Sequence, residues 1–238
     1  MSTKNLYSCG DSFMTVDYPA NKVTSFLELY CQHKEFKHVS LARAGATNFM
    51  IRMQIEQAIE DHADYVVVSN TSVDRIDIVL DIDNQDPWFT LDHILHKGYN
   101  SASELMFPGI NPKMISDTIN NIMWAIHENI VPEQKKQAIK HWVADLHNHS
   151  LQRQKDYFLI SDGLRKLKEY HIPFVYLPKT SMGFMDWSWV ELCWPANELC
   201  PSDMPNGPYD YSKSVTHNDQ TCHDQFAETL KNITQHWT

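Results

Sequence analysis

The stretch Asn5-Leu-Tyr-Ser-Cys-Gly-Asp-Ser-Phe13 decides how this 238-residue chain is expected to fold. Residues Leu6 to Cys9 form a short apolar run that ends at a turn residue, which predicts a buried strand rather than a helix. Gly10 lets the chain leave that strand sharply, so Asp11 and Ser12 are expected at the strand's carboxyl end. In an open α/β sheet this is the edge where ligands bind. A serine at that edge can attack an acyl carbon, although the same three residues also occur in plain polar turns.

Strands and helices alternate after this stretch. The expected helices are Lys22–His33, with Asn21 as its N-cap, and a second one that begins at Thr47 or Asn48 and ends at Glu60. The expected strands are Phe36–Leu41 and Tyr65–Ser69, the latter nearly all apolar, as strands covered on both faces are. Strand-helix-strand-helix-strand with short links predicts a parallel sheet with right-handed crossovers.

The alternation is lost between residues 76 and 149, which we interpret as a helical insertion in a single domain spanning residues 1–238. Helices are expected there at Met114–Glu128 and Glu133–His147, and Asp81–Asp86 is expected to be a solvated acidic turn, because it lacks the glycine and distal glutamate of a calcium loop. After the insertion we expect a helix at Leu151–Tyr170 and a fourth strand at Ile172–Leu177.

Composition excludes some classes of partner. Hydrophobic residues make up 42% of the chain, enough for a sizeable core, and the net charge is −10. Such an acidic chain is not expected to bind nucleic acid, whose phosphates need a basic surface. The sequence shows no signal-peptide pattern and no apolar run as long as a membrane span, and its five cysteines are scattered. We therefore expect a protein that does not bind membranes and is cytoplasmic.

Two clusters allow more than one interpretation. His141, Asp145, His147 and His149 are dense enough for a metal site, but their spacing matches no known ligand pattern, so a polar helix end is favoured and no metal is predicted. The three tryptophans Trp187, Trp189 and Trp194 follow the fourth strand. They fit either a strand packed into the core or an aromatic rim for a sugar or another flat ligand.

Several blocks taken together resemble the SGNH (GDSL-type) hydrolase family. These blocks are Gly10-Asp11-Ser12-Phe13, the glycine in Ala42-Arg-Ala-Gly-Ala-Thr-Asn48, and a histidine before the closing helix. In the family's final block an alanine follows the histidine by ten residues, and His217 and Ala227 keep that spacing. The resemblance implies a three-layer α/β/α sandwich with a mainly parallel sheet. It covers both ends of the chain and the sheet, and leaves the insertion outside.

The resemblance also implies roles for individual residues. Ser12 would be the nucleophile and His217 the base that takes its proton, while the backbone N–H groups of Ser12 and Gly45 would form part of the oxyanion hole. His223 is a competing histidine, but its position within the last helix favours a structural task. No cofactor is predicted.

Two departures from the family pattern matter. The family's Gly-x-Asn-Asp block aligns with Thr71-Ser-Val-Asp74, so the oxyanion-hole asparagine falls on Val73, which cannot donate a hydrogen bond. Thr71, Ser72 or Asn48 could substitute for it. The position three before His217 is Ser214 instead of aspartate, so Asp210, Asp219 or a backbone carbonyl would have to orient the imidazole.

Arg75 follows Asp74 at the same sheet edge and fits either an anionic substrate group or a salt bridge to Asp74 or Asp77. The function expected first is an ester hydrolase that removes acyl groups such as acetate from a small molecule or a carbohydrate, the carbohydrate being suggested by the family and the tryptophans. The alternative is a catalytically impaired binding protein of the same fold that lacks the oxyanion asparagine. A metal-dependent hydrolase using the histidine cluster comes third.

Overall fold

A computed structural model describes residues 3–11, 13–14, 24–43, 46–73, 75–79, 114–118, 133–179, 185–194 and 220–238. Its centre is a four-stranded sheet in the order β2-β1-β3-β6, with every neighbouring pair parallel. The strands are β1 (Asn5–Cys9), β2 (Lys37–Ser40), β3 (Tyr65–Ser69) and β6 (Phe174–Leu177). The parallel sheet and all four expected strands are therefore confirmed, with ends shifted by at most two residues.

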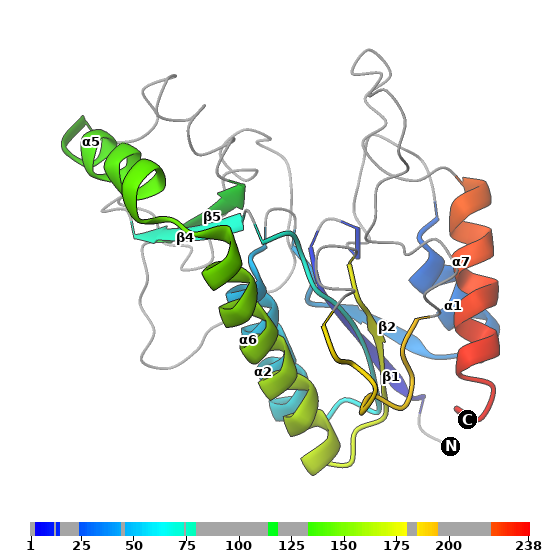
Figure 1. The fold of residues 1–238 in the computed structure, drawn as a ribbon. Coiled ribbons are helices and arrows are strands. Elements are labelled where there is room, and N and C mark those ends of the chain that lie inside the picture. The colour runs from blue at the N-terminus through cyan, green and yellow to red at the C-terminus, as the bar shows by residue number, and fades with distance from the viewer. Residues whose placement is uncertain are drawn as a thin grey trace.

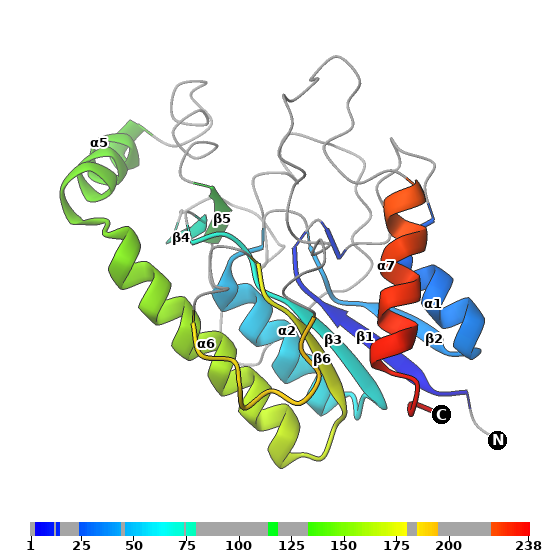
Figure 2. The ribbon, with the colours of Figure 1, turned by 45° about the vertical axis from the view of Figure 1, so that its right-hand side comes forward.

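Helices cover both faces of this sheet, which gives the expected three-layer α/β/α sandwich (Figure 1). One face carries α1 (Phe26–Lys34) and α7 (Gln220–Ile233), and the other carries α2 (Asn48–Glu60) and α6 (His149–Glu169). Figure 2 shows the same arrangement from a second side, with the two ends of the chain lying near each other beside α7. Because both faces are covered, every residue of β3 is buried.

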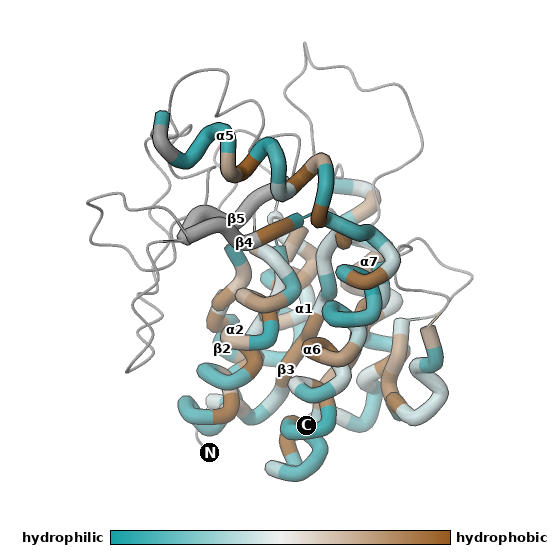
Figure 3. Tube along the Cα trace, turned by 60° about the vertical axis from the view of Figure 1, so that its left-hand side comes forward, coloured by the Kyte–Doolittle hydropathy of each residue, from teal (hydrophilic) through white to brown (hydrophobic). Residues whose placement is uncertain are grey.

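Each helical layer packs on the sheet through its own hydrophobic cluster. Ile51, Ile55 and Leu164 lie against the α2 and α6 face of the sheet, and Phe26 and Leu230 lie against the α1 and α7 face. Figure 3 shows hydrophobic positions gathered between the helices and the sheet, whereas α5 (Glu133–His141) is largely hydrophilic. Burial of this apolar surface is the main free-energy term that holds the layers together.

The starts of two helices test the expected caps. Thr47 caps α2, because its hydroxyl accepts a hydrogen bond from the Met50 N–H at 3.2 Å. Of the two predicted caps, Thr47 and Asn48, the first is therefore confirmed. The prediction of Asn21 as the cap of the first helix is wrong. Ser25 caps α1 in a capping box with Glu28, in which each side chain bonds the other residue's backbone N–H. The box satisfies two N–H groups at once, which explains why α1 begins four residues later than the expected Lys22.

The insertion is not purely helical. A two-stranded antiparallel sheet joins β4 (Arg75–Val79) to β5 (Met114–Thr118), so the helix expected from Met114 is wrong over those five residues. The helix expected at Glu133–His147 is confirmed, as α5 followed by a π-helical turn, η1 (Trp142–Leu146). The acidic turn Asp81–Asp86 lies outside the described residues.

Among the described helices, none combines the length and the apolar character that a bilayer crossing requires. The helix expected at Leu151–Tyr170 is confirmed as α6, and the closing helix is confirmed as α7, in which Ala227 is buried against the core.

Candidate active site

The turn that follows β1 is held by side chains from other elements. Gln54, buried on α2, bonds both backbone groups of Gly10: its Oε1 accepts the Gly10 N–H at 2.7 Å and its Nε2 donates to the Gly10 carbonyl at 3.2 Å. A Cβ added at Gly10 would lie 2.5 Å from Cγ and 2.9 Å from Cβ of Met14. Glycine is therefore needed here because of close packing within the turn, which adds to its expected role in ending the strand.

Asp11 is the centre of this turn and has no exposed surface. Its Oδ2 accepts a hydrogen bond from the Thr71 hydroxyl at 2.7 Å and lies 3.5 Å from Nη2 of Arg75. Its Oδ1 accepts the Phe13 N–H at 3.1 Å, and its backbone carbonyl accepts the Met14 N–H at 3.0 Å. These bonds join the end of β1 to the segment after β3 and to β4.

The electrostatics favour an ionised Asp11. Burial alone would raise the pKa of this carboxyl, but the charges of Arg75 and Lys179 and the hydrogen bonds from Thr71 and Phe13 outweigh burial, so the pKa is lowered from its usual value. A buried carboxylate with this many partners fixes the geometry of its turn, because its removal would leave several donors unsatisfied.

The segment after β3 is fixed by two asparagines. The side chain of Asn48 accepts the Thr71 N–H at 2.9 Å and donates to the Thr71 carbonyl at 3.2 Å. Asn70 accepts hydrogen bonds from the Tyr176 hydroxyl at 2.8 Å and the Lys179 N–H at 2.7 Å, and donates to the Thr71 carbonyl at 3.1 Å. The carboxyl ends of β3 and β6 are thus joined to the start of α2.

Two cationic side chains, Arg75 and Lys179, lie near Asp11 at the carboxyl edge of the sheet. The Arg75 side chain is 12% exposed, and the Lys179 ammonium lies over the Phe13 ring, 5.1 Å from its centre. Arg75 contacts Asp11, which neither predicted alternative includes. Asp74 and the side chain of Asp77, the partners of the alternative salt bridge, lie outside the described residues.

The structure brings some of the expected site residues together. Asn48, Thr71 and Arg75 all meet at Asp11 or at the Thr71 backbone. Ser72 is half-buried beside them, and its carbonyl accepts the Arg75 N–H at 3.2 Å. Val73 packs in the core with the α2 and α6 face. The remaining expected residues, Ser12, Gly45, Asp74, Asp210, His217 and Asp219, lie outside the described residues.

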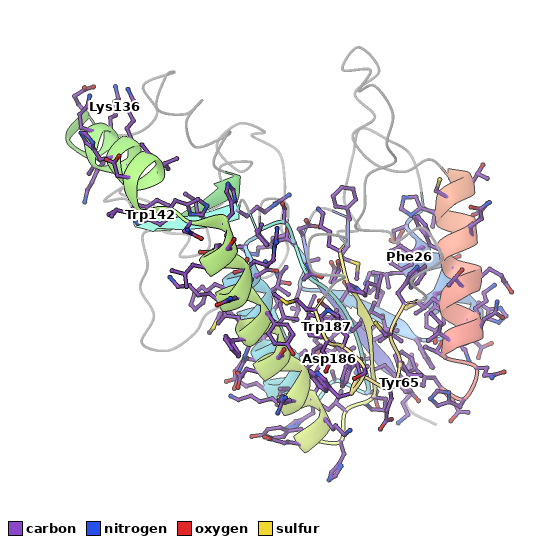
Figure 4. The ribbon with its side chains drawn as sticks, viewed as in Figure 1. Phe26, Tyr65, Lys136, Trp142, Asp186 and Trp187 are labelled. Carbon is purple, nitrogen blue, oxygen red and sulfur yellow. The ribbon has the colours of Figure 1, made fainter. Side chains whose placement is uncertain are left out.

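His223 has the structural task that its position in the last helix favours. Its Nδ1 accepts the N–H of Phe26 at 3.2 Å, and its ring stacks on the Phe26 ring with the centres 6.2 Å apart. Figure 4 shows Phe26 beside α7. Because Phe26 is the first residue of α1, its N–H has no partner within that helix, and the imidazole supplies one.

The histidine cluster at residues 141–149 and the three tryptophans do not form the sites that the sequence allows for them. His141 Nδ1 lies 3.3 Å from the Asp145 carboxylate on an exposed face, and the described part of the chain holds no group of three or more histidine, cysteine or acidic side chains able to bind a metal. Trp187 and Trp194 are buried in the two core clusters, so for them the core interpretation is correct and the aromatic rim is not. Figure 4 shows Trp187 between α6 and the sheet.

Trp189 lies toward the opposite edge of the sheet. It lines a cavity of about 480 Å³ together with Tyr65 and Phe174, which are the first residues of β3 and β6. The chain leaves β6 at its carboxyl end but has returned to the amino ends of the strands by Trp189. The alternative of a tryptophan rim assumes that this segment stays at the edge that carries Asp11, and for Trp189 that assumption is wrong.

Sequence reasoning missed four residues of the site. Asp11 was read only as part of a motif, and Asn70 and Lys179 were not singled out at all. Gln54 was also missed, although a signal existed: it is a polar residue on the apolar stripe of α2 formed by Ile51, Ile55 and Ala58. A polar side chain at such a position needs a buried partner.

No protein-family model matches the sequence, and no curated protein matches it. Among solved structures, one similar chain is a protein of the G-D-S-L family, inferred to be lipolytic, from Desulfitobacterium hafniense DCB-2. The alignment has 11% identity, covers 97% of this chain and 99% of the other, and has a TM-score of 0.48. Another is the salicylyl-acyltransferase SsfX3 from a tetracycline biosynthetic pathway, at 12% identity, covering 99% of this chain and 56% of that one, with a TM-score of 0.38. Identities and TM-scores this low say nothing of what this chain acts on.

Proposed function

We propose that this protein is an ester hydrolase in which Ser12 is the nucleophile. The observation that carries the proposal is the anchoring of Asp11, the residue directly before Ser12 in the chain. Asp11 is fully buried, accepts a hydrogen bond from Thr71 and forms an ion pair with Arg75 at the carboxyl edge of β1 and β3. Ligands of open α/β sheets bind at this edge, and a nucleophile needs a rigid support.

The proposed reaction is two-step acyl transfer. The Ser12 hydroxyl attacks the acyl carbon while the His217 imidazole takes the hydroxyl proton, and that proton then leaves with the alcohol. The same imidazole then takes a proton from water, which attacks the acyl carbon of the acyl-enzyme. The imidazole returns this proton to the Ser12 oxygen as the acid is released. The backbone N–H groups of Ser12 and Gly45 would stabilise the oxyanion, and Asp210 or Asp219 would orient the imidazole. An acetyl ester of a small molecule or a carbohydrate remains the proposed substrate. The burial of Trp187 and Trp194 removes part of the support for the carbohydrate.

A non-catalytic binding protein of the same fold is the second candidate, and one observation favours it. The amides of Asn48 and Asn70 and the hydroxyl of Thr71 are already used in hydrogen bonds, and Val73 is in the core. Of the residues expected to replace the oxyanion asparagine, Ser72 is the one without such a bond among the described contacts. Loss of one oxyanion donor typically costs about 100- to 1,000-fold in rate.

Hydrolysis of 4-nitrophenyl acetate separates the two candidates. Wild type is expected to turn over the ester, and Ser12→Ala and His217→Ala are each expected to lose about 1,000-fold or more. Ser161→Ala is the matched control, because the buried hydroxyl of Ser161 on α6 has no hydrogen-bond partner in the part of the chain that the structure describes. Equal rates for wild type and Ser12→Ala would reject the esterase and leave the binding protein.

A further inference from the structure

Arg75 has more hydrogen-bonding capacity than the described residues use. A guanidinium carries five N–H donors. Its Nη2 faces Asp11 at 3.5 Å, but Nε and Nη1 are both buried and have no hydrogen-bond partner among the described residues. Because an unsatisfied buried donor destabilises a fold, such donors are rare in native structures, and each one needs an explanation.

Lys179 brings a second positive charge to the same place. Both Lys179 and Arg75 act electrostatically on Asp11, which carries one negative charge against their two. No other carboxylate among the described residues forms an ion pair with either cation. The Lys179 ammonium lies over the ring of Phe13, the residue that follows Ser12 in the sequence. The described part of the site is therefore electropositive, although the whole chain is acidic.

A counter-ion role for Arg75 explains only part of this arrangement. Balancing Asp11 requires one positive charge, and Arg75, whose Nη2 lies 3.5 Å from Oδ2 of Asp11, supplies it. It leaves Nε, Nη1 and the charge of Lys179 without a task. Arginine is well suited to bind carboxylate and phosphate oxygens, since its donors lie in one plane.

We infer that the substrate is an ester that carries its own negative charge, a carboxylate or a similar oxyanion, and that Arg75 and Lys179 bind this group. The inference rests on the proposed function and names the substrate class of the same site. The anion would accept hydrogen bonds from the unused nitrogens of Arg75 and would be attracted by Lys179. It would balance the excess positive charge beside Asp11.

Three esters test the inference. 4-Nitrophenyl acetate is neutral, mono-4-nitrophenyl succinate carries its carboxylate on the acyl group, and 4-acetoxybenzoate carries it on the leaving group. For each ester, kcat/KM of Arg75→Gln and Lys179→Gln is divided by that of wild type, which removes the intrinsic reactivity of the ester. For at least one charged ester, this ratio is expected to be about 10- to 100-fold lower than for the neutral ester, which is the loss expected when a hydrogen bond to a charged group is removed. The ester affected shows on which side of the scissile bond the anion sits.

The variants are chosen so that misfolding cannot imitate this result. Lys179→Gln leaves the Asp11–Arg75 contact and the Lys179 N–H bond to Asn70 in place, and Arg75→Lys keeps the charge and is expected to recover part of the lost selectivity. Arg165→Gln is the matched control, because Arg165 lies on α6 over Trp189, and it is expected to change all three ratios equally.

Equal losses for all three esters in Arg75→Gln and Lys179→Gln would overturn the inference and assign Arg75 to the oxyanion or to the support of Asp11. That outcome would leave the proposed function intact as long as Ser12→Ala abolishes turnover of the neutral ester. Absence of turnover of every ester by wild type would reject the proposed function, and the substrate class with it.

Discussion

Gln54 on α2 holds both backbone polar groups of Gly10 at the end of β1, with bonds of 2.7 Å and 3.2 Å. Beyond its strand, a chain no longer has neighbouring strands to satisfy its backbone, so another partner must be supplied if the site is buried. A glutamine amide offers one acceptor and two donors, and it satisfies the N–H and the C=O of Gly10 together. The turn before Ser12 is thereby fixed to the helix layer.

Gln54→Leu tests this clamp. The variant removes the acceptor of the buried Gly10 N–H, whereas the Gly10 carbonyl keeps its hydrogen bond from the Arg43 N–H at 3.2 Å, so we expect the free energy of unfolding to fall by about 1–3 kcal/mol. Urea unfolding monitored by circular dichroism measures the change. Gln57→Leu on the same helix is the control, because the Gln57 side chain bonds Asp61 at the surface, and it is expected to change stability by less than about 0.5 kcal/mol. Similar effects of the two variants would contradict the clamp.

Thr71→Val tests the support of Asp11. Valine has nearly the same shape as threonine but cannot donate the 2.7 Å hydrogen bond to the buried carboxylate. We expect a loss of about 1–3 kcal/mol in the free energy of unfolding and a decrease in esterase activity. Thr71→Ser keeps the hydroxyl and is expected to retain most of both. If the valine variant equals wild type in stability and rate, the bond from Thr71 does not support the site.

Gly10→Ala tests the close packing of the turn. The added methyl group would overlap the Met14 side chain, and we expect a destabilisation of about 1–3 kcal/mol, as for other overpacked positions. The double variant Gly10→Ala/Met14→Ala makes room for the methyl group, although Met14→Ala alone removes a fully buried side chain. A double-mutant cycle in thermal unfolding is expected to give a favourable coupling between the two substitutions. Additive effects would show that Met14 is not what excludes a side chain at position 10.

The parallel sheet could be predicted because its strands are marked by local patterns. Tyr65-Val-Val-Val-Ser69 is a β-branched run bounded by polar residues, and it forms β3 with those bounds. The hairpin of β4 and β5 could not be predicted in this way. Met114-Ile-Ser-Asp-Thr118 has no clear alternation, and its strand conformation depends on pairing with Arg75–Val79, far away in the sequence.

The candidate site was predictable only in its location. Gly10-Asp11-Ser12 indicates the carboxyl edge of β1, and the structure gives that edge a buried, bonded Asp11. Asn70 and Lys179 belong to the site through contacts between residues far apart in the sequence. The residues next to them in the sequence form no pattern that predicts these contacts. The cap of α1 was missed for a different reason. Both Asn21 and Ser25 are residue types that favour the N-cap, and the Glu28 side chain decides for Ser25 by completing a capping box with it.

His38 is expected to make stability depend on pH. Burial lowers its pKa from 6.5 to about 4, and its Nε2 lies 3.0 Å from the Ser8 hydroxyl. Between those two pKa values the unfolded chain binds a proton that the folded chain does not, so stability falls as pH decreases through this range and is fully present above pH 6.5. We expect the titration of His38 to lower the free energy of unfolding by about 2 kcal/mol when the pH is decreased from 7 to 5.

His38→Gln isolates that contribution, since the amide can still bond Ser8 but does not titrate. Urea unfolding of both proteins at pH 7 and pH 5 gives the comparison, and the variant is expected to lose less stability than wild type on acidification. A loss of equal size in both proteins would mean that His38 does not titrate differently on folding.

His223→Leu separates the two histidines of the C-terminal block. The variant removes the acceptor for the Phe26 N–H, and we expect it to destabilise the protein by about 1 kcal/mol. Below its melting temperature, kcat/KM for 4-nitrophenyl acetate is expected to stay within about twofold of wild type, whereas His217→Ala abolishes activity. The reverse pattern would make His223 the catalytic base.

The central claim is that Ser12 is an activated nucleophile, and covalent labelling tests it most directly. The protein is incubated with a fluorophosphonate probe, digested, and mapped by mass spectrometry. The account predicts one stoichiometric adduct on Ser12, which is lost in His217→Ala and kept in His223→Leu. Absence of an adduct on Ser12 under conditions that label a known serine esterase, or an adduct on another serine instead, would contradict it.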